Sequence, residues 1–141
     1  MFAVILSALM LMSSRTSLPP EVWSCRNQIE VWCTVDGCAA KAEDETTPLD
    51  IWARRDTGQF AICAYTGCWE GQADVVETNG RLLWAADDVA FLSGQGGFSA
   101  DVSLLIVKKD GVGFVRVGGF ATPLLCLRSP EGAVASGSNS P

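Results

Sequence analysis

The sequence predicts an all-β protein, with about eight antiparallel strands in a hairpin meander that forms a small barrel or sandwich and is stabilised by disulfides. Three observations predict this fold: short strand-like runs recur along the chain, turn residues separate them, and six cysteines include two pairs at hairpin spacing. A barrel or sandwich protects the strand edges that an open meander would expose. With 141 residues, 48% of them hydrophobic and 18% charged, the chain can bury one core.

The N-terminal segment is expected to direct export. An apolar run, Met1 to Met12, precedes small and polar residues and then Pro19-Pro20. The run has the roughly 7 to 15 residues of a signal-peptide core and is shorter than the roughly 20 that cross a bilayer. We therefore expect residues 1–20 to be a signal peptide and linker of a periplasmic or secreted protein, with no transmembrane segment in the mature chain. A misplaced translation start or an N-terminal strand is the alternative.

An even number of cysteines in an exported chain indicates disulfides. Two hexapeptides, Cys33 to Cys38 and Cys63 to Cys68, carry Gly just before the second Cys, where a positive φ would suit a tight reversal. Cysteines that face each other across a hairpin have disulfide geometry, which favours Cys33–Cys38 and Cys63–Cys68. The remaining pair, Cys25 and Cys126, would join the first strand to the last. This connectivity is a preference among fifteen.

Zinc is the rival interpretation of the two CysX4Cys pairs. The chain contains no His, and structural zinc sites usually space their ligands differently, in reduced proteins. We therefore expect no metal site and no cofactor.

Strand-like runs follow one another through most of the chain. In the first of them, Ile29, Val31, Cys33 and Val35 alternate with Glu30, Trp32 and Thr34, and we expect the aliphatic face to pack while the other meets water. The second run alternates likewise, with Trp52 on the face opposite the aliphatic residues, so Trp32 and Trp52 could form one exposed aromatic patch. The runs span 29–35, 49–54, 59–65, 73–78, 81–85, 103–109 and 112–120.

Hairpin turns are predicted at Asp56-Thr57-Gly58, Asn79-Gly80 and Asp110-Gly111. A short helical turn is expected near 84–91, and a mobile glycine-rich loop over 93–101. Residues 21–128 are then a single β domain, and residues 129–141 have the composition of a disordered tail.

Charge and residue types exclude several functions. A net charge of −6 without any long basic run argues against nucleic-acid binding. Without His there is no Ser-His-Asp or Cys-His arrangement, and we expect no catalytic residues and no enzymatic activity. Glu43-Asp44-Glu45 and Asp87-Asp88 leave one enzymatic alternative, a carboxylate-dependent hydrolase of envelope glycans, although such clusters are usually solvated acids.

The segment from Tyr65 to Gly71 is the candidate contact loop. Two aromatic and two glycine residues surround a turn that a disulfide would stiffen, so little ordering entropy would be lost on binding. Because Tyr and Trp dominate contact energies at interfaces, we take Tyr65, Thr66, Trp69 and Glu70 as candidate binding residues. The alternative is that most of the five tryptophans fill the core, namely Trp23, Trp32, Trp52, Trp69 and Trp84.

The Trp23-Ser24-Cys25 segment, the meander of strands and the lone Cys126 together resemble the bacterial inhibitors of c-type lysozyme. Those inhibitors are small exported β-barrels that insert a loop into the lysozyme cleft, so the resemblance implies a similar barrel. Their Ser-Gly-x-x-Tyr signature is absent here and the two clipped hairpins are additional, so no functional residue is carried over. We expect an exported, non-enzymatic binding or inhibitor-type module for a protein or glycan of the cell envelope. A purely structural envelope protein is a further alternative.

Overall fold

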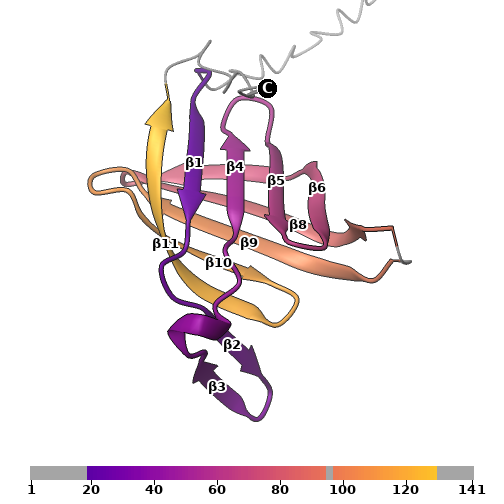
Figure 1. The fold of residues 1–141 in the computed structure, drawn as a ribbon. Helices are drawn as coiled ribbons and strands as arrows, with labels where there is room; N and C mark the ends of the chain where they lie inside the picture. Colours follow the sequence, from indigo (N-terminus) through magenta and orange to yellow (C-terminus); the bar gives the residue numbers. More distant parts are fainter. Residues whose placement is uncertain (1–18, 95–96, 130–141) are drawn as a thin grey trace, which may run out of the picture.

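Eight strands close an antiparallel β-barrel in this computed structural model, which describes residues 19–94 and 97–129 (Figure 1). Around the barrel the order is β1, β4, β5, β6, β8, β9, β10 and β11, and β11 pairs again with β1. The all-β prediction is confirmed, and of its two architectures the barrel is the observed one. The strands are β1 (Val22–Arg26), β2 (Val31–Thr34), β3 (Gly37–Ala40), β4 (Asp50–Arg54), β5 (Gln59–Ala64), β6 (Gly67–Gln72), β7 (Asp74–Thr78), β8 (Arg81–Leu92), β9 (Ser99–Val107), β10 (Val112–Val117) and β11 (Phe120–Ser129).

Three strands lie outside the barrel circuit. The β2–β3 hairpin projects from one end of the barrel together with η1 (Glu43–Glu45), a short 3-10 helix, and it pairs with β11 through Trp32 and Phe120 (Figure 1). Strand β7 continues the path of β6 along the first half of β8. The chain therefore adds a disulfide-clipped appendage to the barrel end where β10 turns into β11.

Alternate side chains of the barrel strands fill the interior, as a two-residue period requires. Three tryptophans, Trp23, Trp69 and Trp84, are buried there, whereas Trp32 and Trp52 are about two-fifths exposed, at 38% and 43%. Trp32 belongs to the appendage and pairs with Phe120, whereas Trp52 lies on the outer face of β4 between Ser24 and Ala61. The core consists of Trp23, Cys25, Leu49, Ile51, Ala53, Phe60, Ile62, Trp69, Leu82, Trp84, Val89, Phe91, Val102, Leu104, Ile106, Val115, Val117, Phe120, Leu124 and Cys126.

Three disulfides link Cys25 to Cys126, Cys33 to Cys38 and Cys63 to Cys68, the pairs that the spacing favoured. Cys25 and Cys126 face each other across β1 and β11, and both are buried inside the barrel. Such disulfides are typical of exported proteins. Among the described residues, none forms a helix with the length and apolar character needed to cross a membrane.

The predicted hairpin turns are confirmed by their backbone angles. Gly58 and Gly111 have φ of 75° and 73°, and Asn79 and Gly80 both have positive φ, as a type I′ turn requires. The positive φ expected at Gly67 is wrong, although Gly37 has one of 139°. A Cβ at Gly67 would overlap the backbone oxygen of Leu92, so this glycine permits the close approach of β6 to β8.

Other local predictions are also corrected. The first strand-like run follows the predicted alternation only within β2, where Val31 and Cys33 are half-buried and Trp32 and Thr34 are exposed. The prediction is wrong for Glu30, which is buried, and for Ile29 and Val35, which are exposed. That run belongs to the appendage, where Glu30 accepts a hydrogen bond from Trp32 and Trp32 pairs with Phe120 of the barrel. The turn expected near 84–91 is strand, because β8 absorbs its polar pair in a β-bulge at Asp87 and Asp88, where Asp88 has a φ of 53°.

Element boundaries differ at two other places. The run at 112–120 is split into β10 and β11, because Gly118 takes a positive φ and turns the chain. Of the loop expected over 93–101, residues 99–101 pair with β8 as part of β9. The proposed signal segment up to residue 18 and the proposed tail from residue 130 lie outside the described residues, and Ser129 is the last residue of β11.

An ionic cluster, in which Glu21 and Arg55 are buried, occupies the barrel end that holds the β4–β5, β7–β8 and β9–β10 turns. Arg55 Nη1 lies 3.0 Å from Glu21 Oε2 and 2.7 Å from Glu77 Oε2, and Lys108 Nζ lies 2.8 Å from Glu77 Oε1. The hydrogen bond from Lys108, with the nearby Arg55 charge, lowers the pKa of Glu77 below its usual value. The carboxylate form of Glu77 is therefore stabilised by the fold.

This pKa shift predicts an acid-sensitive contribution to stability. A depressed folded-state pKa stabilises the protein above the unfolded-state pKa of about 4.3, and this stabilisation disappears as the pH falls through the folded-state value. Wild type should exceed Glu77→Gln in free energy of unfolding at pH 7, and the difference should shrink at pH 3, as measured by urea unfolding. Asp50→Asn, in the exposed Arg26–Asp50 pair, is the control. A Glu77 difference that did not narrow in acid would contradict this assignment.

Candidate functional site

An aromatic pocket of about 590 Å³ opens at the barrel end from which the β2–β3 hairpin projects. Residues of the β2–β3 hairpin, the β5–β6 turn, the β8–β9 connection and the β10–β11 turn form its wall. This volume lies within the range of small-molecule sites in proteins, about 300 to 1,000 Å³. Among the described residues, no acidic or basic side chain lines the pocket. The lining residues are Trp32, Thr47, Ala64, Tyr65, Thr66, Trp69, Phe91, Phe98, Gly118, Gly119 and Phe120.

The aromatic rings of the pocket contact one another in a continuous series. Phe98 stacks on Phe91 with centroids 4.9 Å apart, and Trp69 lies 4.5 Å from Phe91. Trp69 meets Phe120 edge to face at 6.2 Å, and Phe120 lies 4.7 Å from Trp32. Such tilted and offset contacts hold the rings in fixed relative positions, so the pocket wall is largely preformed.

The buried carboxylate of Glu30 orients the outermost ring. It accepts hydrogen bonds from the Trp32 indole Nε1–H and from the Thr47 backbone N–H. The Trp32 ring also covers Gly119, where a Cβ would overlap it. Trp32 is thus fixed in place although it remains 38% exposed.

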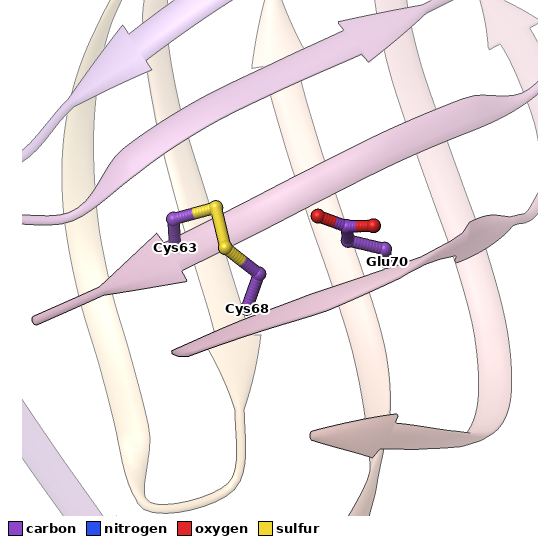
Figure 2. A group of neighbouring side chains, drawn as sticks. All are labelled: Cys63, Cys68 and Glu70. Carbon is purple, nitrogen blue, oxygen red and sulfur yellow. A yellow bond between two sulfur atoms is a disulfide. The ribbon is translucent and has the colours of Figure 1, made fainter. Parts of the chain in front are cut away.

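Three of the four candidate binding residues lie at this pocket. Tyr65 and Thr66 form the β5–β6 turn, and Trp69 lies on the inward face of β6. Glu70 points to the opposite face of β6, on the same side as the Cys63–Cys68 disulfide (Figure 2). The alternation of strand β6 therefore separates Glu70 from the other three residues.

Cys63, Cys68 and Glu70 form the one group in the described chain whose ligand atoms are close enough for a metal ion (Figure 2). Both sulfurs are engaged in the disulfide. A thiolate is the metal-binding form of cysteine, so this group offers one carboxylate while it is oxidised.

Acidic side chains gather at a second site, a shallow depression of about 480 Å³ beside the β8 bulge. Glu70, Asp74, Asp87 and Asp88 line it, whereas Glu43 to Glu45 lie in η1 on the appendage. The sequence clusters that could have formed a carboxylate pair are therefore apart. Asp88 accepts a hydrogen bond from Ser99 Oγ, and Asp101 accepts one from the Asp88 backbone at 3.0 Å, which holds the bulge in shape.

Sequence reasoning missed three phenylalanines of the pocket, Phe91, Phe98 and Phe120. Two of them directly follow a glycine, Gly97-Phe98 and Gly119-Phe120. An aromatic residue that follows a turn glycine, at turns on the same end of a meander, is the sequence signal that could have identified Phe98 and Phe120.

Comparison of the chain with known protein families, with curated proteins and with solved structures finds no match.

Proposed function

We propose that this protein is an exported, non-enzymatic binding module whose ligand inserts an uncharged apolar group into the aromatic pocket. The observation that carries the proposal is the convergence of six aromatic side chains from separate parts of the chain on one open, uncharged pocket. A preformed aromatic surface loses little conformational entropy on binding and gives a large contact energy for its area.

The surroundings of the pocket favour a neutral ligand. The Glu30 carboxylate is buried and occupied by Trp32 and Thr47. Lys41 Nζ lies 5.9 Å from the Trp32 ring centroid, and Lys41 is not among the lining residues of the pocket. An ionised group inside the pocket would lose its hydration without gaining a paired charge, which is unfavourable. A protein or glycan of the cell envelope is the partner that would supply this uncharged group.

Replacing Phe98 by alanine is expected to weaken ligand binding about tenfold, because one stacked wall of the pocket is lost. The probe is N-phenyl-1-naphthylamine, an uncharged aromatic compound whose fluorescence rises in apolar sites. Phe98 is 57% exposed, so its removal should leave the fold intact.

Phe114→Ala is the matched control for this experiment. Phe114 is 41% exposed on the outer face of β10, away from the pocket, and its removal should change probe affinity less than twofold. Tyr65→Ala should weaken binding as Phe98→Ala does, though less, since Tyr65 is 78% exposed. Failure of the wild-type protein to bind the probe, or equal losses in Phe98→Ala and Phe114→Ala, would remove the support for this site.

The alternative function, a carboxylate-dependent hydrolase of envelope glycans, would use the depression at the β8 bulge. Glu70, Asp74, Asp87 and Asp88 offer the two carboxylates that glycoside hydrolysis needs. The binding proposal is preferred because Asp88 is already used to hold the bulge, through its contacts with Ser99 and Asp101.

A further inference from the structure

We propose that the aromatic pocket selects ligands carrying a hydrogen-bond acceptor, a planar uncharged group with a carbonyl oxygen that accepts from the Trp69 indole N–H. This inference rests on the proposed function and specifies the ligand of the same site. It starts from one polar atom at the pocket wall that the fold leaves without a partner.

The tryptophans that belong to the core or the pocket differ in how their indole N–H is satisfied. Trp23 donates to Glu21 Oε1 at 2.7 Å, Trp84 donates to the Arg54 backbone oxygen at 3.2 Å, and Trp32 donates to Glu30. Trp69 is 3% exposed, and its Nε1 is the one buried side-chain nitrogen or oxygen without a hydrogen-bond partner in the described part of the chain. Buried polar groups are nearly always paired, so an unpaired donor at a pocket wall points to an acceptor supplied by a ligand.

The donor edge of the Trp69 ring lies next to a glycine that also lines the pocket. The indole edge that carries Nε1 also carries Cζ2, and a Cβ at Gly118 would lie 3.6 Å from Cζ2. Apart from the chain neighbours of Gly118, no other heavy atom of the described residues lies within 4 Å of that Cβ position. Gly118 also lines the pocket, so the β10–β11 turn, which has no side chain at this point, is the part of the pocket wall next to the buried donor edge.

The ring contacts define the rest of the ligand. Phe91, Phe98 and Phe120 surround Trp69 and offer apolar surface, while the polar side chains of the lining are the hydroxyls of Thr47, Tyr65 and Thr66. Because no charged side chain lines the pocket, a neutral oxygen acceptor suits the site better than a carboxylate. A flat ring system bearing a ketone or amide oxygen combines these features.

The test compares two probes of nearly the same shape, 2-acetylnaphthalene and 2-ethylnaphthalene, of which only the ketone accepts a hydrogen bond. Their dissociation constants are measured by tryptophan fluorescence, and the indole N–H resonances are followed by ¹H–¹⁵N NMR, with Trp69 assigned from its contacts with Phe91. The ketone should move the Trp69 indole resonance downfield, whereas the hydrocarbon should bind without that shift.

Two variants give independent support. Trp69→Phe keeps an aromatic ring and removes the donor, so the preference for ketone over hydrocarbon should fall about fivefold relative to wild type, the effect of one net hydrogen bond. Gly118→Asn tolerates a positive φ and places a side chain next to the donor edge, so it should weaken ketone binding selectively. Near-ultraviolet circular dichroism checks that each variant is folded, and the wild-type NMR measurement needs no variant.

The outcomes separate this inference from the proposed function. If both probes bind and neither moves the Trp69 indole resonance, the acceptor assignment is wrong while the apolar pocket stands as a binding site. If neither probe binds, the proposed function fails and the inference fails with it.

Discussion

Replacing Cys25 and Cys126 together by alanine is expected to lower the free energy of unfolding by about 5 kcal/mol, the largest effect of any change considered for this barrel. The two cysteines are 101 residues apart in sequence, and their disulfide lies inside the barrel between its first and last strands. In the chain-entropy model, a cross-link that closes a loop of about 100 residues contributes ~4.7 kcal/mol. Burial of both side chains adds to the loss.

The Cys33→Ala, Cys38→Ala double variant is the matched control. It removes a disulfide between residues only 5 apart, in the appendage outside the barrel circuit. The same model assigns so short a loop ~2 kcal/mol, and the barrel itself should be unaffected. Urea unfolding followed by tryptophan fluorescence compares the two variants. Equal losses would mean that closure of the long loop is not what the Cys25–Cys126 disulfide contributes.

Features specified by short-range chemistry could be read from the sequence. Asn79-Gly80 supports a tight turn with two positive φ angles, and the structure has both. The hexapeptide spacing of Cys33 and Cys38 favoured a clipped hairpin because cross-strand neighbours have disulfide geometry. Closure of the barrel followed less directly, since it depends on β11 pairing with β1 across the whole chain.

Structural features that depend on contacts between distant segments could not be predicted from the sequence. The burial of Glu30 is an example, because its carboxylate accepts a hydrogen bond from Trp32, which pairs with Phe120 on the distant strand β11. Hydrophobicity alone predicts that Glu30 is exposed and that Ile29 and Val35 pack, whereas Glu30 is buried and the other two are exposed. The bulge at Asp87 and Asp88 is a similar case, because β8 stays extended through a polar pair only where β9 pairs on both sides of it.

The candidate site could be predicted only in part, because some of its residues are close in sequence and others come from distant hairpins. Tyr65, Thr66 and Trp69 lie within one hairpin, so local turn chemistry brought them together in the prediction. Phe98 and Phe120 reach the pocket from other hairpins, and only the circuit of the barrel places them beside Trp69. Glu70 lies apart from the other three candidate binding residues, because strand alternation directs its side chain to the outer face of β6.

Replacing Arg55 by methionine is expected to lower the free energy of unfolding by about 3 to 5 kcal/mol, because it leaves the buried carboxylate of Glu21 without its main partner. Arg55 is 7% exposed and contacts Glu21 and Glu77 through Nη1, and its Nε donates to the Pro19 backbone oxygen at 3.1 Å. After the substitution Glu21 keeps only the hydrogen bond from Trp23 and a charge contact with Lys108 at 3.6 Å.

Arg26→Met provides the contrast, since its pair with Asp50 spans 3.4 Å between side chains that are 71% and 68% exposed. An exposed pair of this kind contributes about 0 to 1 kcal/mol. Adding Glu21→Gln to Arg55→Met should recover part of the lost free energy of unfolding, because the unpaired charge is then removed. If the double variant is no more stable than Arg55→Met, packing rather than charge explains the effect.

The ionic cluster and the aromatic pocket occupy opposite ends of the barrel. Arg55→Met protein that is still folded should therefore bind N-phenyl-1-naphthylamine with wild-type affinity, which separates the stability of the barrel from the chemistry of its site.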